Sequence, residues 1–234
     1  MVDHAHRPPA LSQRPYRLAV LVSGRGSNLQ AIIDAIAQGR LDATVVGVFS
    51  DQCQAAALER VPAPLRWAAA PRDFPNRDDF ETALTTAVMK SDPDCIVCAG
   101  YMRLLKAPFI AQFAPYILNI HPSLLPQYKG LNTHARALAA GDRRHGASIH
   151  VVTAELDAGI VLSQASVPIL ANDTVSSLAA RVLALEHPLL VTTLAALVEQ
   201  RLQLTLDGAT YDKQPLYQPL SLDTQTLSLS PLNQ

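Results

Sequence analysis

Asn119 and His121 lie two residues apart in the stretch LNIHPSLLP (residues 118–126), at the carboxyl end of a predicted strand. Side chains two positions apart in an extended segment project from the same face. An amide and an imidazolium directed at one point can stabilise an oxyanion, and an imidazole can transfer a proton, so the pair suits acyl-type transfer. A hydrogen-bonded structural pair has the same spacing, and the spacing alone leaves both interpretations open.

A polar loop, TAELDAG at residues 153–159, follows another predicted strand. Its carboxylate Asp157 would hold His121 in the charged form if the two side chains meet, although a single loop aspartate is more often simply solvated. His150 lies within that strand, where an inward-facing, hydrogen-bonded residue is expected, with a supporting role at the site as the alternative. No histidine pair has metal-ligand spacing with a suitable carboxylate, so no metal is expected.

A glycine-rich turn, SGRGSN at residues 23–28, joins a buried strand to a predicted helix. Glycines allow close approach of the backbone, and free N–H groups and the helix dipole favour an anion there. The motif lacks the Gly-Lys-Ser/Thr of a P-loop, and Leu29 occupies the place of the third glycine in a dinucleotide fingerprint. A mononucleotide-like or sugar phosphate is the expected ligand. The alternative is a tight turn in which Ser27 or Asn28 merely caps the helix.

The elements that must position these residues follow from the hydrophobic pattern, because short apolar runs alternate with segments of helical spacing. Strands that are apolar on both faces predict an α/β fold: a single domain with a mostly parallel twisted sheet and helices on both faces. Strands are expected at residues 17–22, 43–49, 65–69, 94–99, 116–120, 147–153, 161–168 and 201–206. Helices are expected at residues 28–38, 53–60, 78–91 and 174–199.

The domain boundaries follow from where this pattern begins and ends. Residues 1–15 are expected to form a loose N-terminal tail, residues 16–206 the domain, and residues 207–234 a surface-wrapping C-terminal tail. Cys95 and Cys98 have CxxC spacing but lie within the apolar run CIVCA. Buried strand residues are therefore expected there, in place of a redox pair or half a zinc site.

The composition argues against several classes of partner. A formal net charge of -1 provides no general attraction to nucleic acid or to anionic membranes. No apolar run is expected to reach the roughly eighteen residues of a membrane span. The first residues lack the apolar core of a signal peptide, so a cytoplasmic location is expected. The oligomeric state is left open between monomer and homodimer.

Four blocks together resemble the glycinamide ribonucleotide (phosphoribosylglycinamide) formyltransferase family, in its order and spacing, over residues 17–206. They are SGRGSNL at residues 23–29, AGYMRLL at 99–105, NIHPSLLP at 119–126 and ELD at 155–157. The third block is typical of folate-dependent formyltransferases, and the first narrows the resemblance to the glycinamide ribonucleotide enzyme. The resemblance implies a Rossmann-like formyltransferase domain that transfers the formyl group of 10-formyltetrahydrofolate to the amine of glycinamide ribonucleotide in de novo purine biosynthesis.

The resemblance also implies roles for individual residues. Asn119, His121 and Asp157 would be catalytic. Glycinamide ribonucleotide would be bound by Gly26, Ser27, Asn28 and Glu186, and the folate by Arg77, Met102, Arg103, Leu104, Leu105, Asn119, Thr153, Ala154, Glu155, Leu156 and Asp157. A role of Arg77 at its own helix, or of Glu186 in a surface pair, would explain these two single residues equally well. Both small molecules would act as substrates, with 10-formyltetrahydrofolate as co-substrate and no tightly bound cofactor.

Two departures from the family pattern concern loops. Ala158 stands where the family often has glycine, and Lys129 where proline is common. Two related enzymes share the third block: methionyl-tRNA formyltransferase would need a further C-terminal domain and a basic surface, and formyltetrahydrofolate hydrolase an N-terminal regulatory domain. A non-catalytic folate- or nucleotide-binding protein is the alternative from another class. The intact Asn119, His121 and Asp157 argue against it.

Overall fold

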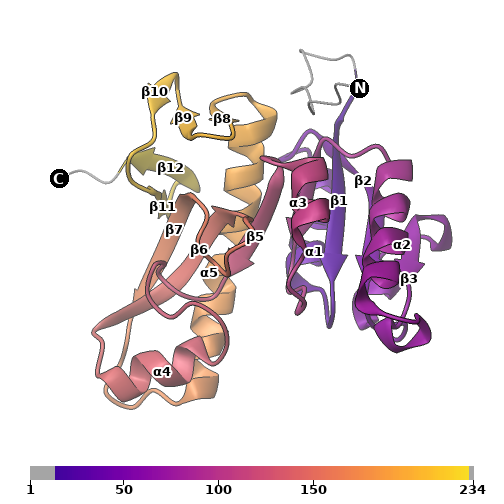
Figure 1. Cartoon of the computed structure of the whole chain (residues 1–234). Coiled ribbons are helices and arrows are strands. Elements are labelled where there is room, and N and C mark those ends of the chain that lie inside the picture. The colour runs from indigo at the N-terminus through magenta and orange to yellow at the C-terminus, as the bar shows by residue number, and fades with distance from the viewer. Residues whose placement is uncertain (1–13, 232–234) are drawn as a thin grey trace. The chain divides into compact units, whose positions relative to one another are not determined.

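The computed structural model describes residues 14–231, and the chain divides into two compact units, Met1–Leu118 and Asn119–Gln234 (Figure 1). The boundary falls within strand β5 (Ile117–His121). Most of the expected N-terminal tail lies outside the described residues. Near its end, Arg14 Nη2 forms an ion pair with Asp94 Oδ1 at 2.9 Å, so Arg14 is anchored to the first unit.

The sheet of the first unit is parallel, with the strand order β4-β1-β2-β3. Residues 18–22 of β1 are fully buried, so both faces of this central strand are covered. The strands are β1 (Tyr16–Val22), β2 (Ala43–Ser50), β3 (Arg66–Ala68) and β4 (Cys95–Cys98). The helices are α1 (Ser27–Ala37), α2 (Arg77–Lys90) and α3 (Ala107–Phe113), with short 3-10 helices η1 (Ala56–Arg60), η2 (Ala63–Leu65) and η3 (Pro71–Asp73).

The strands of the second unit follow the order β12-β11-β7-β6-β5. β6 and β7 pair antiparallel, β11 joins β7 in parallel, and β12 pairs antiparallel with β11. A separate small sheet has the order β10-β9-β8. The strands are β6 (Arg144–Val151), β7 (Val161–Pro168), β8 (Leu202–Leu204), β9 (Ala209–Tyr211), β10 (Gln214–Pro215), β11 (Leu220–Asp223) and β12 (Ser228–Pro231), and the helices are α4 (Thr133–Ala140) and α5 (Val175–Val198).

Most predicted elements are present, and the alternation of helices with mostly parallel strands confirms the predicted α/β class. Cys95 and Cys98 are buried in β4, as expected for strand residues. The predicted helix at residues 53–60 is the shorter η1, and α3 was not predicted. Residues 207–231 have no clear sequence period, yet they form β9 to β12, and β11 extends the sheet along β7. The domain limits 16 and 206 stay predictions.

Helix α5 contains no uninterrupted apolar run of about eighteen residues, but its 24 residues are long and apolar enough on average to cross a membrane by length and composition. Half of the most apolar stretch of 18 residues in this helix is buried. The helix packs on β6 and β7, and its residues Leu178, Val182 and Leu189 are fully buried. Its apolar character therefore belongs to the core of the second unit.

Candidate active site

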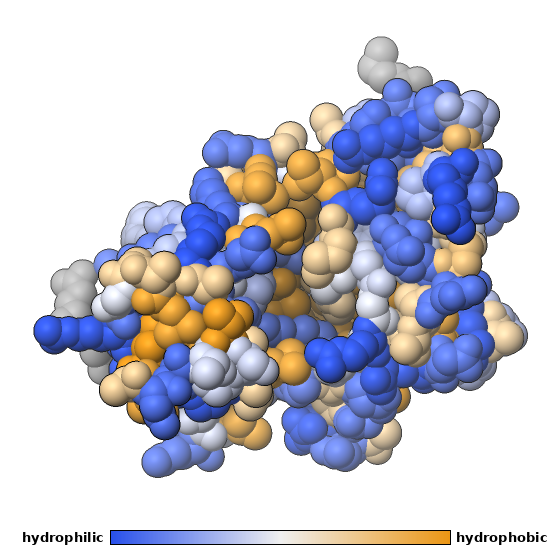
Figure 2. All heavy atoms as spheres, turned by 90° about the horizontal axis from the view of Figure 1, so that it is seen from below, coloured by the Kyte–Doolittle hydropathy of each residue, from blue (hydrophilic) through white to orange (hydrophobic). Residues whose placement is uncertain are grey.

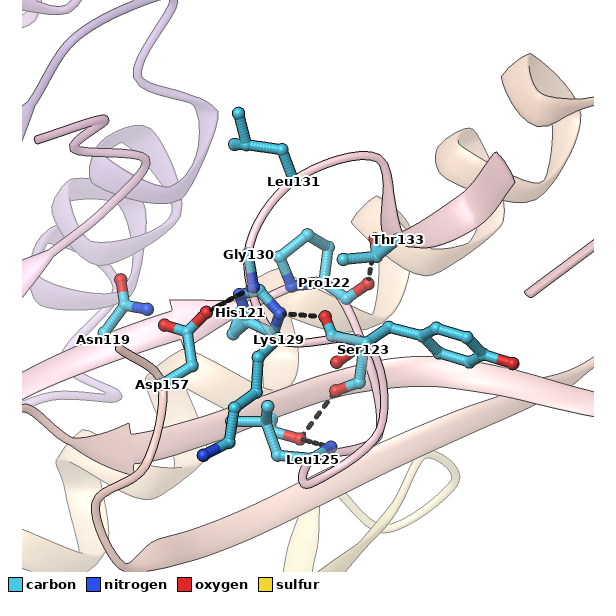
Figure 3. A network of polar contacts seen from close by, with 12 residues as sticks. Asn119, His121, Pro122, Ser123, Leu125, Lys129, Gly130, Leu131, Thr133 and Asp157 are labelled. Atoms are coloured by element: carbon cyan, nitrogen blue, oxygen red, sulfur yellow. Dashed lines mark hydrogen bonds and ion pairs between the residues drawn. The ribbon is translucent and has the colours of Figure 1, made fainter. Parts of the chain in front are cut away.

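Three segments of the second unit bring polar side chains together (Figure 3). Strand β5 carries Asn119 and His121, strand β6 carries His150, and the loop after β6 carries Asp157. His121 and His150 are buried, and only 10% of the Asp157 side chain is exposed. The side chains of Asn119, His121 and Asp157, which the sequence singles out from two separate blocks, thus belong to one cluster.

His121 lies between two hydrogen-bond acceptors. Its Nε2 is 2.9 Å from the carbonyl oxygen of Tyr128, and its Nδ1 faces Asp157 Oδ2 at 3.5 Å. A carbonyl oxygen and a carboxylate can only accept, so the single N–H of a neutral imidazole satisfies one of them at a time. The imidazolium can donate to both. The longer contact, on the Nδ1 side, is the weaker of the two, so that N–H can more readily donate to an incoming group.

The backbone holds the carboxylate of Asp157 in place. Its Oδ2 accepts a hydrogen bond from the Gly130 N–H at 2.8 Å, and its Oδ1 lies 3.6 Å from His150 Nε2. Asp157 has a φ of 46°, in the left-handed region where aspartate is tolerated better than most residues. Since the carboxylate is also largely shielded from water, its interaction with His121 is stronger than the same contact would be at the surface.

His150 orients the amide of Asn119. Its Nδ1 is 3.0 Å from the carbonyl oxygen of Val151, and its Nε2 is 3.0 Å from Asn119 Nδ2. Because the carbonyl only accepts, we assign the ring proton to Nδ1, so that Nε2 accepts from the Asn119 amide. Burial is the main cause that lowers the pKa of His150, against smaller opposing effects of Val151 and Asp157. The neutral ring therefore serves as a fixed acceptor within the cluster.

Two backbone contributors to the cluster, Tyr128 and Gly130, were not predicted. They provide the carbonyl that accepts from His121 and the N–H that donates to Asp157. Neither role depends on the chemistry of a side chain, so no residue type in the sequence marks it. The one available signal was Gly130 itself, whose φ of 78° lies in the region that favours glycine.

The glycine-rich turn at residues 23–28 belongs to the first unit, between β1 and α1. Gly26 is the N-cap residue, with a φ of 71°, so the helix begins without a capping side chain. The alternative in which Ser27 or Asn28 caps this helix is therefore wrong. Within residues 14–231, the backbone N–H groups of Gly24, Arg25, Gly26 and Ser27 have no acceptor in the chain. These N–H groups remain available to an anion.

The carbonyl oxygens of the same turn are occupied. Gly24 O accepts from Ala57 N at 3.0 Å, and Arg25 O accepts from Arg60 Nε at 2.9 Å. A Cβ atom at Gly26 would lie 2.5 Å from Ala57 Cβ, so η1 packs directly against the glycine backbone. Contacts with η1 thus fix the direction of the peptide groups, and the position of Gly26 does not accommodate a larger residue.

The segment at residues 102–105, expected at the folate, is braced by neighbours within the first unit. Arg77 Nη2 donates to the carbonyl oxygen of Leu104, and Arg77 Nε faces Glu81 Oε1 at 3.4 Å. The Met102 N–H donates to Ser23 Oγ at 2.9 Å. Arg77 therefore supports this segment in addition to starting α2, whose N-cap is Asn76. A contact of Arg77 with folate stays a prediction.

The side chains of residues 102–105 alternate in exposure. Met102 and Leu104 are exposed, at 68% and 55%, whereas Leu105 is buried. The guanidinium carbon of Arg103 lies 5.6 Å from the centre of the Phe80 ring. Two of the four side chains thus present apolar surface to solvent, which suits contact with a flat aromatic ligand.

The loop before Asp157 is mostly exposed. Thr153 Oγ1 donates to the carbonyl oxygen of Glu155 at 3.2 Å, Ala154 is exposed, and Leu156 is 44% exposed. Glu155 pairs with Lys129 at 3.5 Å, so the residue found in place of proline connects the two loops. Leu131, next to Gly130, is 74% exposed. Figure 2 shows hydrophobic residues as orange patches among hydrophilic ones on the face seen from below.

Glu186 lies in the middle of α5 and is buried, with 8% of its surface exposed. The alternative in which Glu186 belongs to a surface pair is therefore wrong. A contact of Glu186 with a substrate stays a prediction. Among residues 14–231, no group of three or more His, Cys, Asp or Glu side chains is arranged to hold a metal ion.

A family model described as formyl transferase matches residues 16–194. Phosphoribosylglycinamide formyltransferase of Escherichia coli (strain K12) is 41% identical over 204 residues, and the match covers 85% of this chain and 95% of that protein. The matched region contains the glycine-rich turn and the cluster around His121.

Two solved structures are similar over nearly their whole length. Phosphoribosylglycinamide formyltransferase from Coxiella burnetii, in complex with CHES, has a TM-score of 0.82 at 42% identity and covers 87% of this chain and 96% of its own. Glycinamide ribonucleotide transformylase 1 from Symbiobacterium toebii has a TM-score of 0.81 at 36% identity, and the match covers 88% of this chain and 99% of that one. With the family match, these similarities confirm the predicted formyltransferase fold. The chain belongs to the formyl transferase family.

Proposed function

We propose that this protein transfers the formyl group of 10-formyltetrahydrofolate to the amine of glycinamide ribonucleotide, giving formylglycinamide ribonucleotide and tetrahydrofolate. The observation that carries the proposal is the buried cluster in which His121 Nδ1 faces Asp157 Oδ2 at 3.5 Å while Asn119 is oriented through His150. An amide, an imidazole and a shielded carboxylate in one place are the groups that formyl transfer between two amines requires.

In the proposed reaction, the substrate amine attacks the formyl carbon and forms a new C–N bond. The carbonyl oxygen becomes an oxyanion in the tetrahedral intermediate. Collapse of this intermediate breaks the bond between the formyl carbon and N10 of the folate, and the proton lost by the amine goes to the departing N10. No covalent bond to the enzyme forms at any step. Holding both substrates in place supplies a large part of the rate, because a bimolecular step becomes effectively unimolecular.

Asn119 and protonated His121 stabilise the oxyanion in this proposal. The Asn119 amide has two N–H bonds, of which one is used by His150 Nε2 and the other can donate to the oxyanion. The Nδ1–H of His121 has only the longer contact with Asp157, so it can also donate to the oxyanion. Each donor of this kind contributes about 3 kcal/mol of transition-state stabilisation.

Asp157 supports the charge on His121 and takes part in moving the amine proton, with or without a water molecule between. Its carboxylate can do this because Gly130 and the two histidines hold it from different sides. A negative charge beside the imidazolium also compensates the cost of burying a positive charge in the cluster. The direct contact with His121 is thus the part of the proposal that a single substitution tests best.

The substrate phosphate is assigned to the glycine-rich turn, through the N–H groups of Gly26 and Ser27 and through Asn28. This assignment is supported by the free N–H groups and the occupied carbonyl oxygens of the turn. Glu186 is assigned to glycinamide ribonucleotide, where its carboxylate would face the glycinamide. The folate is assigned to residues 102–105 and 153–157 with Arg77 and Asn119, where exposed apolar side chains suit a pterin ring.

Both small molecules act as substrates in this proposal, and no tightly bound cofactor is required. We propose no nucleic-acid or membrane partner, because the net charge of -1 provides no general attraction to polyanions. A cytoplasmic location follows from the same proposal, since small phosphorylated metabolites and reduced folates are intracellular substrates. A non-catalytic binding protein is the alternative, and it would keep ligand binding without turnover.

A formyl-transfer assay on the full chain tests the proposal. The purified protein would be mixed with glycinamide ribonucleotide and 10-formyltetrahydrofolate, and release of the folate product followed by absorbance. Product formation that requires both substrates is expected. Hydrolysis of the folate without the amine substrate would indicate a hydrolase, and binding of both molecules without product would indicate the non-catalytic alternative. Asn119→Ala provides the control for background transfer.

A further inference from the structure

Residues 128–130 support both charged members of the catalytic cluster with main-chain groups. The Tyr128 carbonyl oxygen lies 2.9 Å from His121 Nε2, and the Gly130 N–H donates to Asp157 Oδ2 at 2.8 Å. These two groups belong to consecutive peptide units, on either side of Lys129. The orientation of His121 relative to Asp157 therefore depends on the conformation of a single short segment (Figure 3).

Tyr128 adopts a conformation that is unfavourable for its residue type. Its φ is 55°, in the left-handed region, where a bulky side chain costs about 1–2 kcal/mol relative to the usual regions. Such a conformation persists only when surrounding contacts determine it. The carbonyl of Tyr128 points at His121 because the peptide is held in this conformation, so the contacts that hold it also position the histidine.

Those contacts come from the side chain of Tyr128 and reach α4 and the turn that follows. The Tyr128 hydroxyl donates to Asp142 Oδ2 at 2.6 Å, and the guanidinium carbon of Arg136 lies 5.2 Å from the centre of the Tyr128 ring. The ring of His145 is a further neighbour, and its centre lies 6.1 Å from that of the Tyr128 ring. Arg136 Nη1 also donates to the carbonyl oxygen of Lys129 at 2.6 Å, which secures the next peptide.

We infer that Tyr128 is a positioning residue for catalysis: its hydroxyl contact with Asp142 fixes the backbone carbonyl that orients His121. The inference rests on the proposed formyl transfer and extends it to a residue that the proposal assigns to neither substrate. Its chemistry is indirect, because the phenol itself faces away from the cluster toward Asp142. Loss of the hydroxyl lets residues 128–130 relax toward ordinary backbone conformations, and His121 Nε2 loses a correctly placed acceptor.

Tyr128→Phe and Asp142→Asn each weaken this anchor while preserving the size of the side chain. In each variant, kcat is expected to fall about tenfold, because small displacements of a catalytic group cost that much or more, while KM for both substrates stays within about twofold. The double variant is expected to resemble either single variant, since both remove the same contact. Tyr217→Phe is the matched control: Tyr217 is 90% exposed, so removal of the same hydroxyl there is expected to leave kcat unchanged.

A second readout does not depend on turnover. Histidine ring ¹⁵N spectra of the free protein would be recorded for the wild type, Tyr128→Phe and Asp142→Asn, with the His121 signals identified by their absence in His121→Gln. The His121 ring signals are expected to move in both anchor variants and to stay in place in Tyr217→Phe. Circular dichroism and thermal melting establish that each variant is folded, and Asp142→Asn serves if Tyr128→Phe is not.

The outcomes separate this inference from the proposed function. An inactive wild-type protein would contradict the formyl-transfer proposal, while a shift of the His121 signals in the anchor variants would still support the positioning role. Unchanged His121 signals, or a kcat equal to that of wild type in folded Tyr128→Phe and Asp142→Asn, would overturn the inference. A rise in KM with constant kcat would also overturn it, because it would place Tyr128 in substrate binding.

Discussion

The side-chain amide nitrogen of Asn119 and Nε2 of His150 lie 3.0 Å apart, so a histidine of strand β6 orients the amide of strand β5. The other ring nitrogen of His150 is 3.0 Å from the carbonyl oxygen of Val151, which fixes the tautomer. The amide is therefore held with one N–H satisfied and one available. Any chemistry that uses the Asn119 amide therefore also depends on His150.

Replacing His150 tests that relationship. We expect His150→Ala to lower kcat by roughly 10- to 100-fold, because the Asn119 amide loses its fixed acceptor and can rotate away from the oxyanion. His150→Gln, whose amide oxygen can accept from Asn119, is expected to retain more activity than His150→Ala. Steady-state kinetics of the three proteins provide the measurement. Equal activity of the alanine variant and the wild type would show that Asn119 does not need this partner.

Substitution of the charged pair addresses the chemical step. Asp157→Asn keeps an oxygen that can accept from Gly130 N–H but removes the negative charge beside His121. We expect kcat to fall about a hundredfold or more in Asp157→Asn and in His121→Ala, with much smaller changes in substrate Kd. Single-turnover kinetics and equilibrium binding separate the two quantities. Full turnover in both variants would refute the assigned roles.

In the glycine-rich turn, a larger residue in place of Gly26 is expected to clash with its neighbours. A Cβ there would lie 2.5 Å from Ala57 Cβ and 2.9 Å from Ala57 Cα, so Gly26→Ala must displace the turn. We expect KM for glycinamide ribonucleotide to rise at least about tenfold, and stability to fall by about 1–3 kcal/mol. Gly39→Ala is the matched control, since Gly39 has a similar φ of 68° and nothing within 4 Å.

Comparison of Gly26→Ala with Gly39→Ala separates the effect of the steric clash from the effect of backbone strain. Both should lose stability through the left-handed conformation, as measured by urea denaturation, but only Gly26→Ala should affect the substrate that carries the phosphate. An equal rise in KM in Gly39→Ala would show that general destabilisation is responsible. An unchanged KM in Gly26→Ala would place phosphate binding elsewhere.

Because of His145, we expect the folded protein to lose stability in acid. Burial first, and then the neighbouring His134, lower the pKa of His145 from 6.5 to about 4. Because the folded protein disfavours the protonated form, the contribution of His145 to the free energy of unfolding is complete above pH 6.5 and is lost as the pH falls through about 4. Its Nε2 lies 3.1 Å from His134 Nδ1, a contact that cannot survive protonation of both rings.

Urea denaturation between about pH 7 and about pH 4.5 measures this effect. We expect the free energy of unfolding of the wild type to decrease over that interval, and the decrease to be smaller in His145→Gln, which can still hydrogen-bond to His134. The pKa values of His134 and His187 are also lowered, chiefly by burial, so part of the pH dependence remains in the variant. Identical slopes in both proteins would exclude His145 as a contributor.

Local sequence patterns were enough to identify most elements of the fold. The apolar run before the glycine-rich turn, the helical spacing after it and the apolar run at Cys95 each correspond to β1, α1 and β4. The reason is that hydrophobic periodicity reports burial along one element, and burial on both faces is a property of strands in a covered sheet. Residues 207–231 lack such a pattern because short strands at a sheet margin bury few side chains, and β11 and β12 were therefore not predicted.

For the proposed active site, the sequence by itself predicted the side chains that would carry the chemistry, because Asn119, His121 and Asp157 belong to motifs whose residue types suit the proposed reaction. Only the tertiary structure decided how they are held. The acceptor role of His150 depends on a contact between two strands, β5 and β6, across 31 residues of sequence, and the contributions of Tyr128 and Gly130 come from peptide groups that every residue possesses. A backbone group acquires its function from conformation and position, and neither is written in the identity of its own side chain.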